Sequence, residues 1–133
     1  MMITEPSQLH RSMQPEKQGF FRRGVELFNR REFFACHEAL EEIWTPSRGP
    51  ERQFLQALIH FAVGFYHHQR HNQAGAERQL RKGLKKLVPF LPEFDGVDTG
   101  RLRAEVSQRL EAIAAGRRVE DFPQISLFQE RFL

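Results

Sequence analysis

The residues with the clearest chemical potential in this chain of 133 are His37, Glu41 and Trp44, which are spaced as His-x-x-x-Glu-x-x-Trp. Side chains three or four positions apart are neighbours on an α-helix, so this spacing would place an imidazole within reach of a carboxylate and beside an indole. Imidazole and carboxylate groups suit zinc, manganese or iron. The motif predicts a polar site on one helix, but it specifies neither a reaction nor a substrate.

A helix over residues 33–44 is expected to position these side chains. At about 100° per residue, its apolar residues form a stripe on one side. The stripe consists of Phe33, Cys36, Leu40, Ile43 and Trp44. Glu38 and Glu42 point to the opposite side, and His37 and Glu41 fall between the two faces. Both groups would therefore be partly removed from water. Cys36 lies within the stripe, which predicts a buried packing residue instead of a nucleophile.

A second helix, over about residues 51–70, is apolar nearly all round and is expected to be the central one. Its exception is a narrow polar row made by Gln53, Gln56, His60, His67 and His71. One hypothesis is that this row faces His37 and Glu41 and completes a pocket, with His67 as a third metal ligand. The other is that the row is simply exposed to water, while Glu41 accepts a hydrogen bond from His37 and the pair only stabilises the bundle.

A helix over about residues 73–88 has a basic outer face. Its cations include Arg78, Arg81, Lys82, Lys85 and Lys86. Such a face is either a solvated surface or a site for phosphate groups, whose attraction falls steeply with salt. Aromatic residues do not interleave with these cations, so the pattern does not indicate a surface for stacking single-stranded bases. We expect Arg78, Arg81, Lys82 and Lys85 to make any phosphate contacts.

The remaining segments predict an all-α protein. Further helices are expected at about residues 16–28 and 99–115, and the apolar tail after Gly116 is expected to dock as an extended segment. Residues 89–98 contain prolines that cannot continue a helix. Two helical hairpins, matched by Cys36, Leu40 and Trp44 against Ala76, Leu80 and Leu84, would combine with a closing helix. The expectation is a flexible arm over residues 1–14 and a single compact bundle of about five helices over residues 15–133.

Composition narrows the class of protein. The chain is 40% hydrophobic, carries a net charge of +3 and has one cysteine, which excludes a disulfide framework and a multi-cysteine metal motif. It has no run of about 18 apolar residues and no basic-then-apolar N-terminus. We therefore expect a soluble, cytoplasmic protein that does not enter a membrane. A homodimer formed through a spare apolar face is a further expectation.

The chain resembles domain-of-unknown-function family 309, whose signature is His-x-x-x-Glu-x-x-Trp/Tyr. Besides residues 37–44, the resemblance is carried by residues 28–34, 54–59, 66–67, 72–76 and 96–98, and it covers roughly residues 20–128. It implies a small helical protein of bacteria or archaea whose signature has been suggested to bind a metal.

By matching position, the resemblance carries over His37, Glu41 and Trp44, and Gln56 and His67 also match. His60 and His71 depart from the family pattern and add two imidazoles.

Two groups of residues therefore form the candidate site. The metal ligands would be His37, Glu41 and His67, and Trp44, Gln56 and His60 would line a pocket between the two helices. The metal would be a divalent ion such as zinc, manganese or iron. The alternatives are a nucleic-acid or phosphate-binding module that uses the basic helix, and an interaction protein in which His37 and Glu41 only stabilise the bundle. A helical-ribonuclease pattern, Arg31 followed by His37, is a looser alternative.

Overall fold

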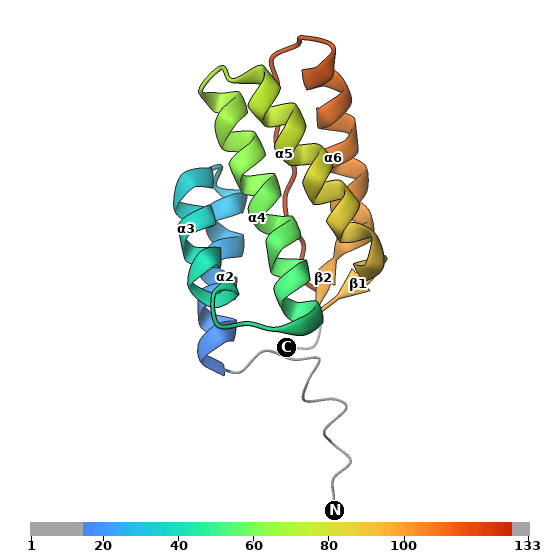
Figure 1. The fold of residues 1–133 in the computed structure, drawn as a ribbon. Helices are drawn as coiled ribbons and strands as arrows, with labels where there is room; N and C mark the ends of the chain where they lie inside the picture. Colours follow the sequence, from blue (N-terminus) through green and yellow to red (C-terminus); the bar gives the residue numbers. More distant parts are fainter. Residues whose placement is uncertain (1–14, 129–133) are drawn as a thin grey trace, which may run out of the picture.

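The computed structural model describes residues 15–128, which form a bundle of helices that run alternately up and down (Figure 1). The helices are α2 (Pro15–Asn29), α3 (Phe33–Trp44), α4 (Gly49–Gln69), α5 (Gln73–Leu87) and α6 (Thr99–Ala114). The central helix, α4, lies between α3 and α5. This arrangement confirms the all-α prediction. The predicted N-terminal arm and the last five residues lie outside the described residues.

Two local features were not predicted in detail. The central helix begins at Gly49, ahead of the predicted start, and Pro50 lies in its first turn. Proline is tolerated there because the first backbone N–H groups of a helix have no intrahelical partner. After α5, a 3₁₀ turn (Val88–Phe90) leads into an antiparallel pair of strands, β1 (Glu93–Phe94) and β2 (Val97–Asp98). Strands of two residues are too short to show the alternation that predicts a strand.

The C-terminal tail docks along the bundle, as predicted. The side chain of Asn29, at the end of α2, holds the tail through two hydrogen bonds. Its side-chain oxygen accepts a hydrogen bond from the Ile125 N–H at 2.7 Å, and its amide donates to the Ile125 carbonyl at 3.0 Å. Further along, Leu127 forms a β-bridge with Val97. The tail thus ties the first helix to the β-hairpin.

The two hairpins repeat with an offset of 40 residues. In the first, Gly24 of α2 lies against Leu40 of α3, and in the second, Gly64 of α4 lies against Leu80 of α5. The turns between the helices repeat as well, because Arg31 and His71 both have a positive φ, of 67° and 64°. These equivalences support the internal repeat expected from the sequence.

One buried histidine was not predicted. His68 is fully buried near the end of α4, where its Nε2 accepts a hydrogen bond from the Val119 N–H at 2.9 Å. The Arg118 guanidinium donates to the His68 carbonyl at 2.7 Å. Helical periodicity places His68 on the apolar side, but it cannot show that the partner comes from the tail, about 50 residues away. His68 joins the central helix to the C-terminal segment.

Replacing Gly64 by alanine is expected to lower the free energy of unfolding by about 1–3 kcal/mol, the usual cost of overpacking. A Cβ at this position would lie 2.7 Å from Leu80 Cδ2 and 3.3 Å from the Leu80 nitrogen, and Leu80 is fully buried. Gly19→Ala is the matched control, because nothing lies within 4 Å of a Cβ there. Because alanine has a higher helix propensity than glycine, Gly19→Ala should stabilise the protein by up to about 1 kcal/mol. Urea unfolding, monitored by circular dichroism, measures the free energy of unfolding of both variants. Equal effects at the two sites would contradict the close contact.

His68 is expected to make stability depend on pH. Burial is the main cause that lowers its pKa in the folded chain, and the Arg118 guanidinium lowers that pKa further. Below about pH 6.5 the unfolded chain takes up a proton that the folded chain does not, so the free energy of unfolding should fall as the pH falls. His68→Gln should flatten this dependence in urea titrations at several pH values. The exposed His71 makes the smallest contribution to the lowering of the His68 pKa, so His71→Gln should change the pH dependence much less than His68→Gln does.

Candidate functional site

The pair of His37 and Glu41 forms as expected on α3. His37 Nε2 lies 3.5 Å from Glu41 Oε2, and the two side chains are 22% and 49% exposed. The other ring nitrogen, Nδ1, lies 3.1 Å from the Phe34 carbonyl oxygen. A carbonyl oxygen only accepts hydrogen bonds, so Nδ1 carries the hydrogen and Nε2 is directed at the carboxylate. The backbone of the preceding turn therefore sets the orientation of the imidazole.

In this orientation, Nε2 and the carboxylate oxygen of Glu41 face each other. In a neutral imidazole of this tautomer, Nε2 presents a lone pair to a carboxylate oxygen, which also offers only lone pairs. Either a proton on Nε2 or a metal ion bound by both atoms removes that repulsion. Tetrahedral ligands about 2.1 Å from zinc lie about 3.4 Å apart, close to the observed 3.5 Å. A ligating histidine also commonly donates its second N–H to a backbone carbonyl. These two donors fit a divalent metal.

His67 is not brought to this pair. Its Nδ1 lies 3.4 Å from the Asn72 side-chain nitrogen, and its ring packs where a side chain at Gly75 of α5 would collide with it. Across residues 15–128, no three His, Cys, Asp or Glu side chains are grouped so that they could hold a metal ion. The third ligand expected from the sequence therefore belongs to the interface between α4 and α5.

His60 also faces α5. Its Nδ1 lies 2.8 Å from Oε1 of Gln79, and its buried Nε2 has no hydrogen-bond partner within the described part of the chain. Burial is the main cause that lowers the His60 pKa, and Lys86 and Lys82 add to it by repulsion. The hydrogen bond to Gln79 opposes these effects in part. His60, one of the predicted pocket residues, therefore lies on the side of α4 that faces α5 and not beside His37 and Glu41.

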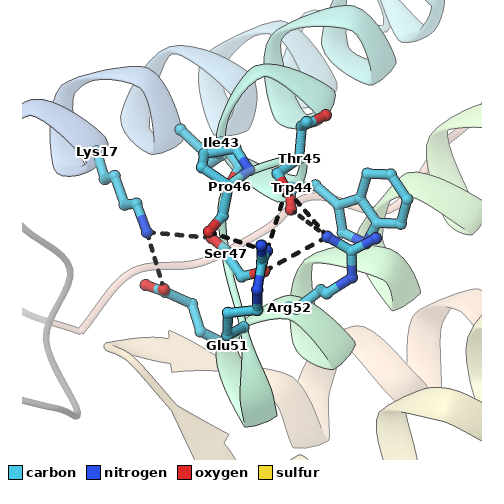
Figure 2. A network of polar contacts seen from close by, with 9 residues as sticks. Lys17, Ile43, Trp44, Thr45, Pro46, Ser47, Glu51 and Arg52 are labelled. Carbon is cyan, nitrogen blue, oxygen red and sulfur yellow. Dashed lines mark hydrogen bonds and ion pairs between the residues drawn. The ribbon is translucent and has the colours of Figure 1, made fainter.

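Trp44 supports the turn between α3 and α4, where Figure 2 shows a network of polar contacts. The Arg52 guanidinium lies 3.8 Å from the centre of the indole ring. It also donates to the carbonyl oxygens of Trp44 at 2.9 Å and of Thr45 at 3.2 Å. Arg52 therefore satisfies carbonyl groups that the end of α3 leaves without intrahelical partners. The sequence motif did not identify this residue, since nothing in the spacing links Trp44 to the first turns of the next helix.

Lys17 completes the same network from α2. Its ammonium group lies 3.2 Å from the Ser47 hydroxyl and 3.3 Å from a Glu51 carboxylate oxygen (Figure 2). Ser47 is buried and donates to the Ile43 carbonyl at 2.6 Å. The remaining pocket candidate, Gln56, is half-buried on α4. The end of the signature motif is thus part of a hydrogen-bonded turn that joins α3 to α4.

The predicted basic face of α5 is exposed at Arg78, Arg81, Lys82 and Lys85. Among the described residues, Arg81 pairs with Glu77 at 3.6 Å, and the other three make no ion pair with a carboxylate. The face therefore has charge available for an anion. Nothing in the geometry of these four side chains shows that one binds.

Cys36 is not a nucleophile at neutral pH. It is fully buried, and burial raises the pKa of its thiol to about 12. Arg31 lies over the Phe122 ring at 5.6 Å, and no contact with His37 joins it to the motif. Within residues 15–128, no helix combines the length and the apolar character needed to cross a membrane.

Comparison with known proteins agrees with the motif. The chain is 34% identical over 97 residues to the uncharacterized protein YpuF of Bacillus subtilis (strain 168). The match covers 68% of this chain and 56% of YpuF, so the chain spans little more than half of that relative. Residues 21–79, which contain the whole of α3 and α4, match the model of the family described as a domain of unknown function (DUF309), and the chain belongs to this family.

Proposed function

We propose that this protein binds a divalent transition metal through His37 and Glu41. The observation that carries the proposal is the orientation of the His37 ring. Its Nδ1 lies 3.1 Å from the Phe34 carbonyl oxygen, so that Nε2 and the Glu41 carboxylate present two donor atoms 3.5 Å apart. An imidazole and a carboxylate suit zinc, manganese or iron. Of the three ligands expected from the sequence, the proposal keeps these two. His67 would join them only if its ring left Asn72 and Gly75.

A site with two protein ligands is open and binds more weakly than closed sites with four. Glu41 is half-exposed, so water would fill the other coordination positions. A metal held in this way supplies an acidic bound water and a Lewis acid. On the protein side, the Phe34 carbonyl fixes the ring of His37, and the i,i+4 spacing keeps Glu41 beside it. Neither residue lies in the core, so the folded state does not require the metal.

The competing hypothesis gives the pair a purely structural role. A surface pair of this spacing stabilises a helix by about 0.2–0.5 kcal/mol, which is small compared with the core packing around α4. It would be an ion pair only while His37 is protonated. This hypothesis predicts no metal uptake at any concentration of zinc or manganese, and so it is separable from the proposal.

His37→Ala and Glu41→Gln are each expected to weaken zinc binding by at least about tenfold, because each removes one of two protein ligands. His67→Ala is the matched control and should bind zinc like the unmodified chain. Isothermal titration calorimetry with zinc and with manganese measures the affinity, and elemental analysis of untagged, undialysed protein measures the content. If the unmodified protein neither contains nor takes up metal, or if all three variants bind it equally, the proposal is wrong.

Two further predictions concern the binding of anions and the association of two copies of the chain. Phosphate or nucleic acid at Arg78, Arg81, Lys82 and Lys85 is favoured by the absence of a carboxylate partner for three of these cations within residues 15–128. A homodimer through an apolar face has Phe20 and Phe34 as its exposed aromatic candidates.

A further inference from the structure

Three basic turns lie together at one end of the bundle. α2, α4 and α6 run in the same direction, and each is followed by two basic residues. These are Arg30 and Arg31, Arg70 and His71, and Arg117 and Arg118. Contacts join the turns, since the Gln69 side chain donates to the Arg31 carbonyl at 3.2 Å and Arg118 donates to the His68 carbonyl at 2.7 Å. Residues that are far apart in the sequence thus form one surface, which we call the basic end.

The same backbone geometry ends all three helices. The N–H groups of Glu32, Asn72 and Arg117 donate to carbonyl oxygens five residues earlier, at 2.9, 2.8 and 3.0 Å. The residue before each has a positive φ, of 67° at Arg31, 64° at His71 and 82° at Gly116. This is the Schellman pattern, which ends a helix and turns the chain outward. The three turns therefore share one backbone geometry. The basic pair ends at the positive-φ residue in the first two turns and begins directly after it in the third.

The charge of this end is not neutralised within the described residues. All six basic residues are exposed, and none of the five arginines forms an ion pair with a carboxylate in residues 15–128. The same turns contain two acidic residues, Glu32 and Glu120. The helix dipole favours cations at the C-terminus of each helix. It does not explain why the cations of three separate helices lie together on one surface. The excess of positive charge indicates an anionic partner.

Aromatic rings lie among these arginines. Phe34 is 47% exposed, and its ring lies 5.2 Å from that of Tyr66. Arg70 lies over the Tyr66 ring and Arg31 over the Phe122 ring, each at 5.6 Å from the ring centre. The outer face of α5 has the charge but lacks such rings. The basic end therefore combines the two features that bind single strands, positive charge for the backbone and flat surfaces for bases.

We propose that the basic end binds single-stranded nucleic acid, with Arg30, Arg70 and Arg117 at phosphates and a base stacked on Phe34 beside Tyr66. Aromatic side chains stack on every base type, so the site would have little sequence preference. Bases in a duplex are already stacked on each other and cannot use Phe34. The proposal does not depend on metal binding, because it uses neither His37 nor Glu41.

The test is fluorescence anisotropy with labelled oligo-uridine, oligo-thymidine and a duplex of similar length. Single strands should bind at low salt, with an affinity that falls as salt rises, because each neutralised phosphate contributes a logarithmic slope of about −0.7. Phe34→Ala should weaken binding about tenfold, which corresponds to one stacked base. Phe20→Ala is the matched control, because Phe20 is 49% exposed but lies in the first half of α2, toward the other end.

The arginines are tested separately from the rings. Replacing Arg30, Arg70 and Arg117 together by glutamine should abolish most of the binding and lower the salt slope by about 2, at about 0.7 for each contact. Replacing Arg78, Arg81 and Lys85 on α5 is the control and should change little. Circular dichroism confirms that each variant is folded.

The proposal would be overturned by no binding at low salt, by loss of binding only in the α5 variant, by equal affinity for the duplex, or by binding to phosphatidylserine vesicles without binding to either single strand. Binding that is unaffected by both Phe34→Ala and the triple arginine variant would be equally decisive against it.

Discussion

The close packing of α4 against α5 determines how the rest of the molecule is arranged. It depends on glycines in both helices, because a side chain at Gly64 would collide with Leu80 and one at Gly83 with Phe61. With no Cβ in the way, the two helices approach closely and bury the phenylalanine side of α4. Gly75 extends this contact to the end of α4, where it makes room for the ring of His67.

This packing also decides which histidines can cooperate. The approach of α5 takes His60 to Gln79 and His67 to Asn72 and Gly75, so neither imidazole lies in a cluster with His37 and Glu41. Two imidazoles of the polar row, those of His60 and His67, are thus turned toward α5. A metal site in this protein is consequently reduced to what α3 supplies, and the orientation of His37 by its own helix becomes the decisive feature.

The sequence was sufficient to predict what depends on local periodicity. The helices, the burial of Cys36 and the contact of His37 with Glu41 all follow from spacing along one helix, and each was predicted. Contacts between helices were not predictable in the same way. Periodicity gives the sector of α4 that carries His67 but not which helix lies beside that sector. Two other contacts also join segments that meet only in the folded chain. Arg52 lies over the Trp44 ring, and the Val119 N–H donates to His68.

The basic end illustrates the same limit. Two basic residues after a helix are unremarkable in any single turn, and the sequence showed no aromatic residues among the cations of α5. Only the up-and-down order of the helices brings the turns after α2, α4 and α6 to one end and sets Phe34 and Tyr66 beside Arg70.

Phe34 then takes part in both proposed sites through different atoms. Its carbonyl oxygen orients His37, and its ring lies at the basic end, 5.2 Å from the ring of His37. Truncation of this side chain removes the ring and leaves the carbonyl in place, so the two proposals can fail independently although one residue serves both.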